Sequence, residues 1–172
     1  FFLKADIRNI TTSYYQLRAL LPRILGESIP STFQQLGQFT VRGDATITET
    51  SIDSRVNLNC AIGNSFIDLD LTDIDNIDDA SYIGFVSLID FDLGKFAGNQ
   101  SLGRASMDLN VEGKGFVRST LNTEVIGEVY NLVYNGYEYR NVNVSGVLKD
   151  QLFDGSLVSK DENLQFSFKG LA

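Results

Sequence analysis

Carboxylates are the side chains of this sequence that could most readily do acid–base or metal chemistry. Six aspartates gather in the segment 68–79, and they are Asp68, Asp70, Asp73, Asp75, Asp78 and Asp79. A calcium loop places oxygen ligands at fixed offsets around a central glycine, and this segment contains no glycine. Asp68 and Asp70 instead alternate with apolar residues, which predicts the solvated face of a β-strand.

Other reactive residue types are scarce. Asp90 and Asp92 could form a catalytic carboxylate pair, but the sequence offers no partner or pocket for them. The chain has no histidine, which excludes a Ser-His-Asp triad, a Cys-His dyad and a histidine-bound metal within it. Its single cysteine, Cys60, alternates with Leu58 and Ile62, so we expect a core residue rather than a nucleophile. We therefore expect no enzyme activity, no cofactor and no metal site.

Two further features could indicate phosphate or base recognition. Gly113-Lys114-Gly115 is not followed by the serine or threonine and the helix of a phosphate-binding loop, so a tight turn between strands is predicted. Four tyrosines could form a stacking platform for bases or sugars, and they are Tyr130, Tyr134, Tyr137 and Tyr139. However, 14 basic and 22 acidic residues give a net charge of −8, which disfavours nucleic acid. Tyrosine pairs are also common between the strands of a hairpin.

The size and composition of the chain predict one packed structural unit. It has 172 residues, of which 43% are hydrophobic and 21% are charged, and this balance disfavours disorder. No apolar run approaches the length of a membrane-spanning helix, which is about 20 residues. Both ends read as strands interrupted in mid-pattern, and the start lacks a signal-peptide layout. We expect a segment cut from a longer chain.

Helical signals are confined to the first 37 residues. Thr11 to Ser13 offer capping hydroxyls before apolar residues at helical spacing, which predicts a helix over about 12–21 that Pro22 ends. A capping-box pattern at Ser31 predicts a second short helix over about 31–36, before Gly37. Residues 1–37 are therefore expected to form a strand and two short helices.

From residue 38 to residue 172, apolar and polar residues alternate in successive runs. This period of two predicts antiparallel strands with one apolar and one solvated face. Glycines at spaced apolar-face positions allow such a sheet to curl around that face. The predicted fold is mainly β, a curled antiparallel sheet with an open apolar groove. A sandwich, in which a second sheet covers the apolar face, is the alternative.

Turn signals set the register of the last fifty residues. Asn135-Gly136 predicts a type I′ hairpin that pairs Tyr134 with Tyr137. A two-residue turn at Asp150 and a loop over residues 160–163 extend the sheet to three further strands. The predicted rungs on one face are Gly127-Val144-Leu157-Phe166, Val125-Gly146-Gly155-Phe168 and Thr123-Leu148-Phe153-Gly170.

The apolar positions of these strands are the predicted groove lining. They are Val41, Ile47, Leu58, Ile62, Met107, Leu109, Val111, Val125, Val129, Val142, Val144, Leu148, Phe153, Leu157, Phe166 and Phe168.

The tip of the Asn135 hairpin is a special case, because its apolar residues change parity. Val129 and Val142 face each other below the tip, whereas Leu132 and Tyr139 face each other nearer to it. A bulge in one strand alone would break the shared register, so the tip is predicted to have no bulge and to bury its reverse face. The expected cover is the first helix, through Leu17, Leu21 and Ile24.

Several segments resemble the TamB family, the translocation and assembly module subunits among the AsmA-like proteins of Gram-negative bacteria. They are Leu102–Phe116, Thr120–Gly127, Tyr134–Gly146, Phe153–Leu157 and Asp161–Phe166. The resemblance covers about Phe33 to Ala172. These segments are signatures of a repeating β module and carry no catalytic motif.

The resemblance implies a periplasmic segment of a parent protein anchored in the inner membrane. Such proteins cross the periplasm as a long curled sheet with an apolar interior, often called a β-taco. The implied partners are phospholipid acyl chains and an outer-membrane protein of the Omp85 class. Lipid carriage is thus the leading hypothesis, and a scaffold for assembling outer-membrane β-barrels or a purely structural spacer are the alternatives.

Overall fold

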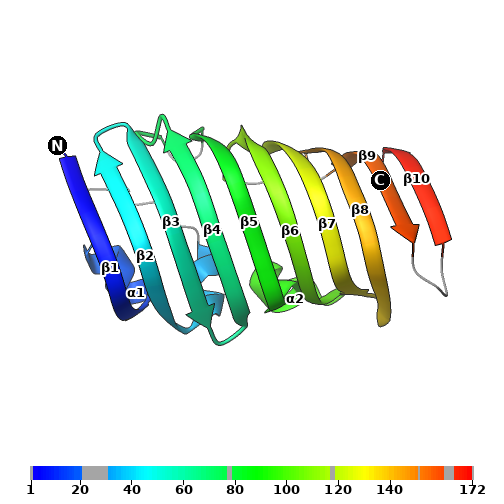
Figure 1. The fold of residues 1–172 in the computed structure, drawn as a ribbon, viewed down its shortest axis with the longest axis horizontal. Coiled ribbons are helices and arrows are strands. Elements are labelled where there is room, and N and C mark those ends of the chain that lie inside the picture. The colour runs from blue at the N-terminus through cyan, green and yellow to red at the C-terminus, as the bar shows by residue number, and fades with distance from the viewer. Residues whose placement is uncertain are drawn as a thin grey trace.

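A computed structural model describes residues 2–20, 31–76, 79–116, 119–150, 152–160 and 165–171. Within these residues, ten strands form a single antiparallel sheet in which each strand pairs with its neighbours in the chain (Figure 1). The strands are β1 (Phe2–Ser13), β2 (Gln38–Thr48), β3 (Ser51–Cys60), β4 (Gly63–Thr72), β5 (Ser81–Asp92), β6 (Leu102–Lys114), β7 (Asn122–Tyr134), β8 (Tyr137–Lys149), β9 (Leu152–Lys160) and β10 (Gln165–Leu171). The mainly β prediction is confirmed.

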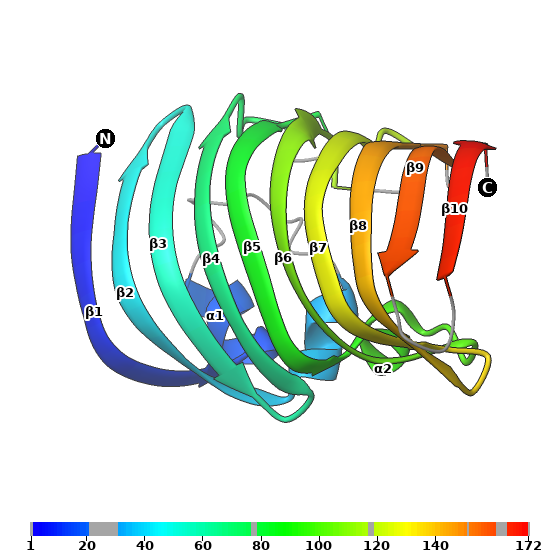
Figure 2. The same cartoon turned by 45° about the vertical axis from the view of Figure 1, so that its right-hand side comes forward.

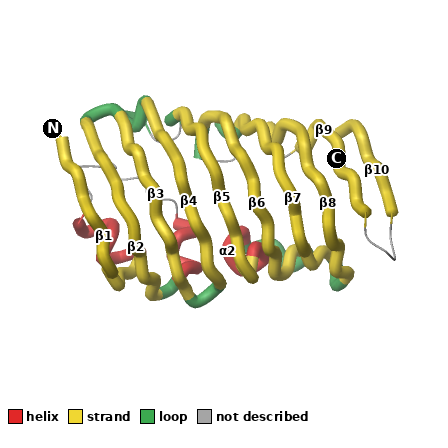
Figure 3. Tube along the Cα trace, in the orientation of Figure 1, coloured by secondary structure: helices red, strands yellow, loops and turns green. Residues whose placement is uncertain are grey.

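Short helices lie on one side of the sheet, near one end of the strands (Figure 3). Helix α1 (Tyr14–Leu20) and the 3₁₀ helix η1 (Ser31–Leu36) lie at the two segments where helices were predicted. Helix α2 (Leu93–Ala97) follows β5 and was missed. None of the described helices is long and apolar enough to span a membrane.

The face that carries the helices is the inner face, and its residues form continuous rungs across the sheet. The alternation of side chains places apolar and small residues there, and polar residues on the opposite, outer face. Three inner rungs run from β2 to β9. They are Val41-Leu58-Ser65-Leu88-Met107-Val129-Val142-Ser159, Gly43-Val56-Ile67-Val86-Leu109-Gly127-Val144-Leu157 and Ala45-Ser54-Leu69-Gly84-Val111-Val125-Gly146-Gly155.

The predicted register is confirmed from β7 to β9. Asn135 and Gly136 both have positive φ, 50° and 79°, as a type I′ turn requires. Tyr134 pairs with Tyr137, and Val144 pairs with both Gly127 and Leu157.

The predicted register between β9 and β10 is wrong by two residues. Leu157 pairs with Phe168, and Phe166 pairs with Ser159. Strand β9 extends to Lys160, which the prediction placed in the loop, and β10 begins at Gln165. A shift of two keeps the parity, so Phe166 and Phe168 retain the predicted face by register.

The hairpin tip also differs from its prediction, because extra residues are inserted at one level of three strands. On β5, Asp90 has a φ of 47° and the register to β6 shifts between Leu88 and Phe91. On β7, the register to β6 shifts at Tyr130. On β8, Asn141 has a φ of 51°. Because Tyr130 of β7 lies opposite Asn141 of β8, the irregularities of the two strands coincide and leave the register between them unchanged, so the prediction of no bulge is wrong.

The expectation of a strongly curled sheet is not confirmed. Figure 2 shows the lower parts of several strands bending toward the helices, but the sheet as a whole is not strongly curled. Bulges bend strands locally, and the register of β2 to β4 is regular throughout. The glycines of the inner face therefore allow neighbouring strands and side chains to lie close together, but they do not curl the whole sheet.

Candidate apolar binding face

Helices cover the inner face at one end of β2 to β5. A buried cluster there consists of Leu36, Phe39, Ile62 and Phe91. Leu17 of α1, Phe33 of η1 and Phe96 of α2 pack against it. The rings of Phe91 and Phe96 meet edge to face at 5.6 Å, which is a favourable aromatic geometry. The first helix therefore packs on this cluster and not on the hairpin tip, while Leu21 and Ile24 lie outside the described residues.

Three predicted lining residues belong to this covered region. Ile62 is 1% exposed in the turn after β3, so it is a core residue and cannot line an open groove. Val41 and Leu58 pack against the same cluster. Cys60 also packs there, as predicted for a core residue, and its Sγ lies 3.1 Å from the carbonyl oxygen of Gly63. The alternation pattern identified the correct face but carried no information about its cover.

A second cluster continues the inner face over β6 to β9. Ala105, Met107, Val129 and Val142 are buried, and Leu93 of α2 packs against both clusters. Helix α2 thus marks the boundary between the covered part of the face and the part beyond it.

Beyond α2, the inner face forms a cavity of about 210 Å³. Its lining comes from β7, β8 and β9, and consists of Val129, Leu132, Tyr134, Tyr139, Val142, Val144 and Leu157. Tyr134 and Tyr139 therefore line the same surface as Val144, so the prediction that the tip buries its reverse face is wrong. The inserted residues described above return the tip side chains to the inner face. The change of parity in the sequence is the signal for this irregularity of the strands. It was interpreted instead as a regular hairpin whose tip buries its reverse face.

A pair of inward glycines makes room for an aromatic ring beside this cavity. Gly146 of β8 and Gly155 of β9 are directly paired. A β-carbon built at either position would meet backbone atoms of the paired strand first and Cζ of Phe153 at 2.7 Å, so both the close approach of the strands and the Phe153 ring exclude a larger residue. The sequence predicted an aromatic neighbour for Gly155 but assigned it to Phe168, because the β10 register was displaced.

At the end of the strands opposite the helices, the inner face carries a polar contact. The hydroxyl groups of Tyr82 and Thr123 form a hydrogen bond between β5 and β7. Both residues are buried, and burial raises the pKa of Tyr82 while the Thr123 contact opposes that rise. The ring of Phe116 lies 4.8 Å from the Tyr82 ring. The sequence pattern placed Thr123 on this face by register, but it predicted no contact of Thr123 with Tyr82 or Phe116.

The other predicted lining residues are placed on the inner face by register. Ile47 pairs with Ile52, and the remainder lie on the rungs of β6 to β9, namely Leu109, Val111, Val125 and Leu148. These positions are half-buried. For Phe166 and Phe168 the structure gives the strand register alone.

The carboxylates considered for catalysis have structural partners. Asp92 caps α2, because its Oδ1 accepts a hydrogen bond of 2.9 Å from the backbone N–H of Lys95. Asp90 forms an ion pair with Arg104 at 2.6 Å. Asp68 forms an ion pair with Arg55 at 2.8 Å on the outer face, where the alternation placed it.

Comparisons with known protein families, curated protein sequences and solved structures find no match. The geometry alone therefore describes what the face can do. It presents an apolar surface without charged side chains in its cavity lining, and such a surface binds apolar groups by removing them from water.

Proposed function

We propose that this chain is a periplasmic segment of a TamB-like protein and that its inner face shelters phospholipid acyl chains on their way between the two membranes. The observation that carries the proposal is the apolar cavity over β7 to β9, beyond the part of the face that the helices cover. In the parent protein, we propose that this face is part of a longer open groove.

The chemistry of acyl chains fits this surface. Sheltering a hydrocarbon chain requires a dry lining and no nucleophile or metal, and each buried methylene contributes about 0.8 kcal/mol. Side chains such as Val144 and Leu157 are only half-buried, so an acyl chain can cover the apolar surface that they still expose. No catalytic role is proposed for the chain, and no cofactor.

Photocrosslinking tests the proposal. A photoreactive residue replaces Val144 in the parent protein in Gram-negative cells, and adducts are identified by mass spectrometry. We expect phospholipid adducts, because Val144 lines the cavity. The matched control is Ser145, the next residue on β8, whose side chain is exposed on the outer face. Equal lipid yield from the two positions would contradict the proposal.

Assembly of outer-membrane β-barrels is the second candidate, and the edge strand β1 favours it. Among the described strands, β1 pairs with β2 alone, and strand addition at an edge strand is a known mode of recognising a client polypeptide. Its Phe2 and Ile10 are 68% and 51% exposed. Adducts of client polypeptide at β1, with no lipid at Val144, would favour this function and a partner of the Omp85 class. If neither lipid adducts at Val144 nor client adducts at β1 form, the remaining alternative is a purely structural spacer.

A further inference from the structure

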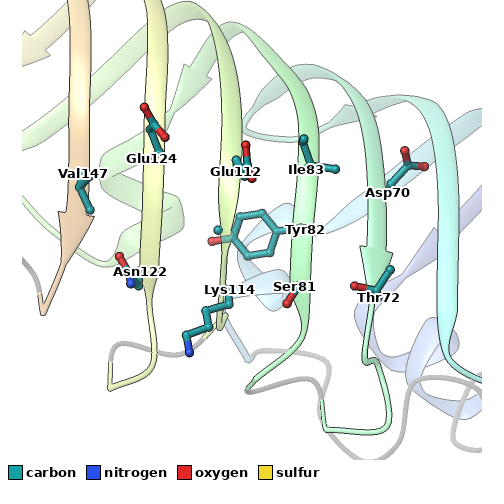
Figure 4. Close-up of a pocket in the computed structure, with 11 residues that line it drawn as sticks. Asp70, Thr72, Ser81, Tyr82, Ile83, Glu112, Lys114, Asn122, Glu124 and Val147 are labelled. Carbon is teal, nitrogen blue, oxygen red and sulfur yellow. The ribbon is translucent and has the colours of Figure 1, made fainter.

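The outer face carries a second distinctive surface, which the proposed function does not use. Two adjoining hollows of about 570 and 630 Å³ lie over β4 to β8. They share Asp70, Ile83, Glu112 and Glu124, so they form one continuous depression, the outer hollow. Figure 4 shows these four side chains and Val147 in one row across five neighbouring strands.

Carboxylates in this row lie directly opposite one another. Glu112 pairs with Glu124, and Asp70 pairs with Asp53 of β3. Like charges at directly opposed positions destabilise a sheet. Among the described residues that line the outer hollow, Lys114 is the single basic one. Arg55 of β3 forms an ion pair with Asp68 at one edge of the hollow, whereas the described residues form no ion pair with Asp70, Glu112 or Glu124. Part of the negative charge of this surface is therefore left without a cationic partner.

Exposed apolar side chains lie among these carboxylates. Ile83, Ile126 and Val147 are 52%, 48% and 38% exposed, and all three line the outer hollow. A single exposed aliphatic residue is ordinary. Three of them within one depression, bordered by acidic residues, match a partner that has both cationic and apolar side chains.

We propose that the outer hollow docks a basic amphipathic helix of another protein. The chain carries a net charge of −8, so electrostatic repulsion disfavours a second copy, nucleic acid and an anionic lipid surface at this site. A cationic helix neutralises the opposed carboxylates while its apolar side chains cover the exposed aliphatic residues.

The spacing of the sheet favours a helix over an extended segment. Neighbouring strands lie about 4.8 Å apart, and one helical turn advances about 5.4 Å, so a helix lying across the strands presents one turn to each strand. Residues on the same face of an extended segment are about 6.6 Å apart, so they do not match the spacing of the strands. The four strand spacings from β4 to β8 span about 19 Å, which corresponds to about 13 helical residues.

Binding of a designed peptide tests the inference. The probe is a fluorescent, amidated peptide of about 14 residues of leucine, alanine and lysine, with leucines on one helical face and lysines beside them. We expect saturable binding to the chain, with a gain of helical circular dichroism signal. Glu112→Gln with Glu124→Gln removes one opposed pair and should weaken binding about tenfold. A peptide of the same composition in scrambled order should bind at least about tenfold more weakly.

The matched control variant is Asp6→Asn with Asp44→Asn. These residues form an opposed acidic pair between β1 and β2, outside the outer hollow, with Arg8 and Arg42 beside them. We expect less than about a twofold change in affinity for this variant. Equal weakening in both double variants, or equal binding of the scrambled peptide, would overturn the inference. A dimer of the chain that Glu112→Gln and Glu124→Gln abolish would assign the surface to a second copy and would also overturn it.

Discussion

Gly146 and Gly155 face each other on β8 and β9, and the Phe153 ring fills the space above them. We predict that Gly155→Ala lowers the free energy of unfolding by about 2–3 kcal/mol, because the added methyl group would meet the backbone of Ser145 and Gly146 as well as the Phe153 ring. Overpacking costs about 1–3 kcal/mol, and the lower chain entropy of alanine offsets part of it. Urea unfolding measures the change. Ser156→Ala, one residue along β9 on the outer face, should change stability by less than about 0.5 kcal/mol, and an equal loss would contradict the packing argument.

Tyr82 is expected to make stability depend on alkaline pH. Burial raises its pKa above the ordinary value of 10.0, so the unfolded chain loses this proton first as the pH rises. The stabilisation from protonated Tyr82 is therefore complete below about pH 10 and is lost as the pH rises through the folded pKa. Urea unfolding between about pH 8 and pH 11 should show a smaller alkaline loss for Tyr82→Phe than for wild type. Tyr137→Phe, at an exposed position, should retain the wild-type slope.

The carboxylates that were considered for catalysis have structural roles, as a helix cap and as a partner in an ion pair. Asp92 begins α2, and Asp90 stands at the bulge of β5 with Arg104. The sequence identified both residues because of their carboxylates. The pairing of Asp90 with Arg104 depends on a turn that brings β6 back beside β5, and residue type alone does not contain that information. The capping contact of Asp92 is local to α2.

At the scale of elements, the bulges of β5, β7 and β8 shape the inner face. Asn141 adopts a φ of 51°, a region that asparagine tolerates and that costs a β-branched residue about 1–2 kcal/mol. We predict that Asn141→Val lowers the free energy of unfolding by about this amount, whereas Asn141→Gly has little effect. Thermal unfolding provides the measurement. At Asn143, two residues along the same strand, valine should be neutral because the backbone there is extended; equal losses at both positions would refute the local strain.

Sequence information was sufficient for the elements whose turns have strong local signals. Asn135-Gly136 set the register of β7 and β8, and the alternation from Gln38 onward identified the apolar face. The β9–β10 loop has no comparable signal, so both ends of the predicted loop lie one residue too early in the chain. Helix α2 has only five residues, too few for apolar periodicity, although Asp92 and Gly98 mark its two ends.

At the scale of the whole molecule, the two faces of one sheet have different chemistry. The inner face is covered by helices at one end of β2 to β5 and forms an apolar cavity over β7 to β9. The outer face carries paired acidic residues and exposed aliphatic side chains. Which strands the helices would cover could not be predicted, because helix placement depends on packing between segments far apart in the chain.

This difference between faces predicts opposite outcomes for two adjacent residues of β9. Leu157 packs against the inner cluster and lines the cavity, whereas Ser156 points to the outer face by alternation. A charge in an apolar environment is costly, so Leu157→Asp should lower the free energy of unfolding by about 2–3 kcal/mol. It should also abolish lipid adducts from Val144. Ser156→Asp should be nearly silent in both measurements.

A third variant separates folding from binding. Leu157→Ala keeps the site apolar and should retain lipid adducts despite a loss of stability, because the cavity lining stays free of charge. Comparing the two Leu157 variants at equal folded fractions, measured by circular dichroism, isolates the effect of the charge. If Leu157→Asp and Ser156→Asp reduce lipid adducts equally at equal folded fractions, the inner face is not the surface that holds the acyl chains.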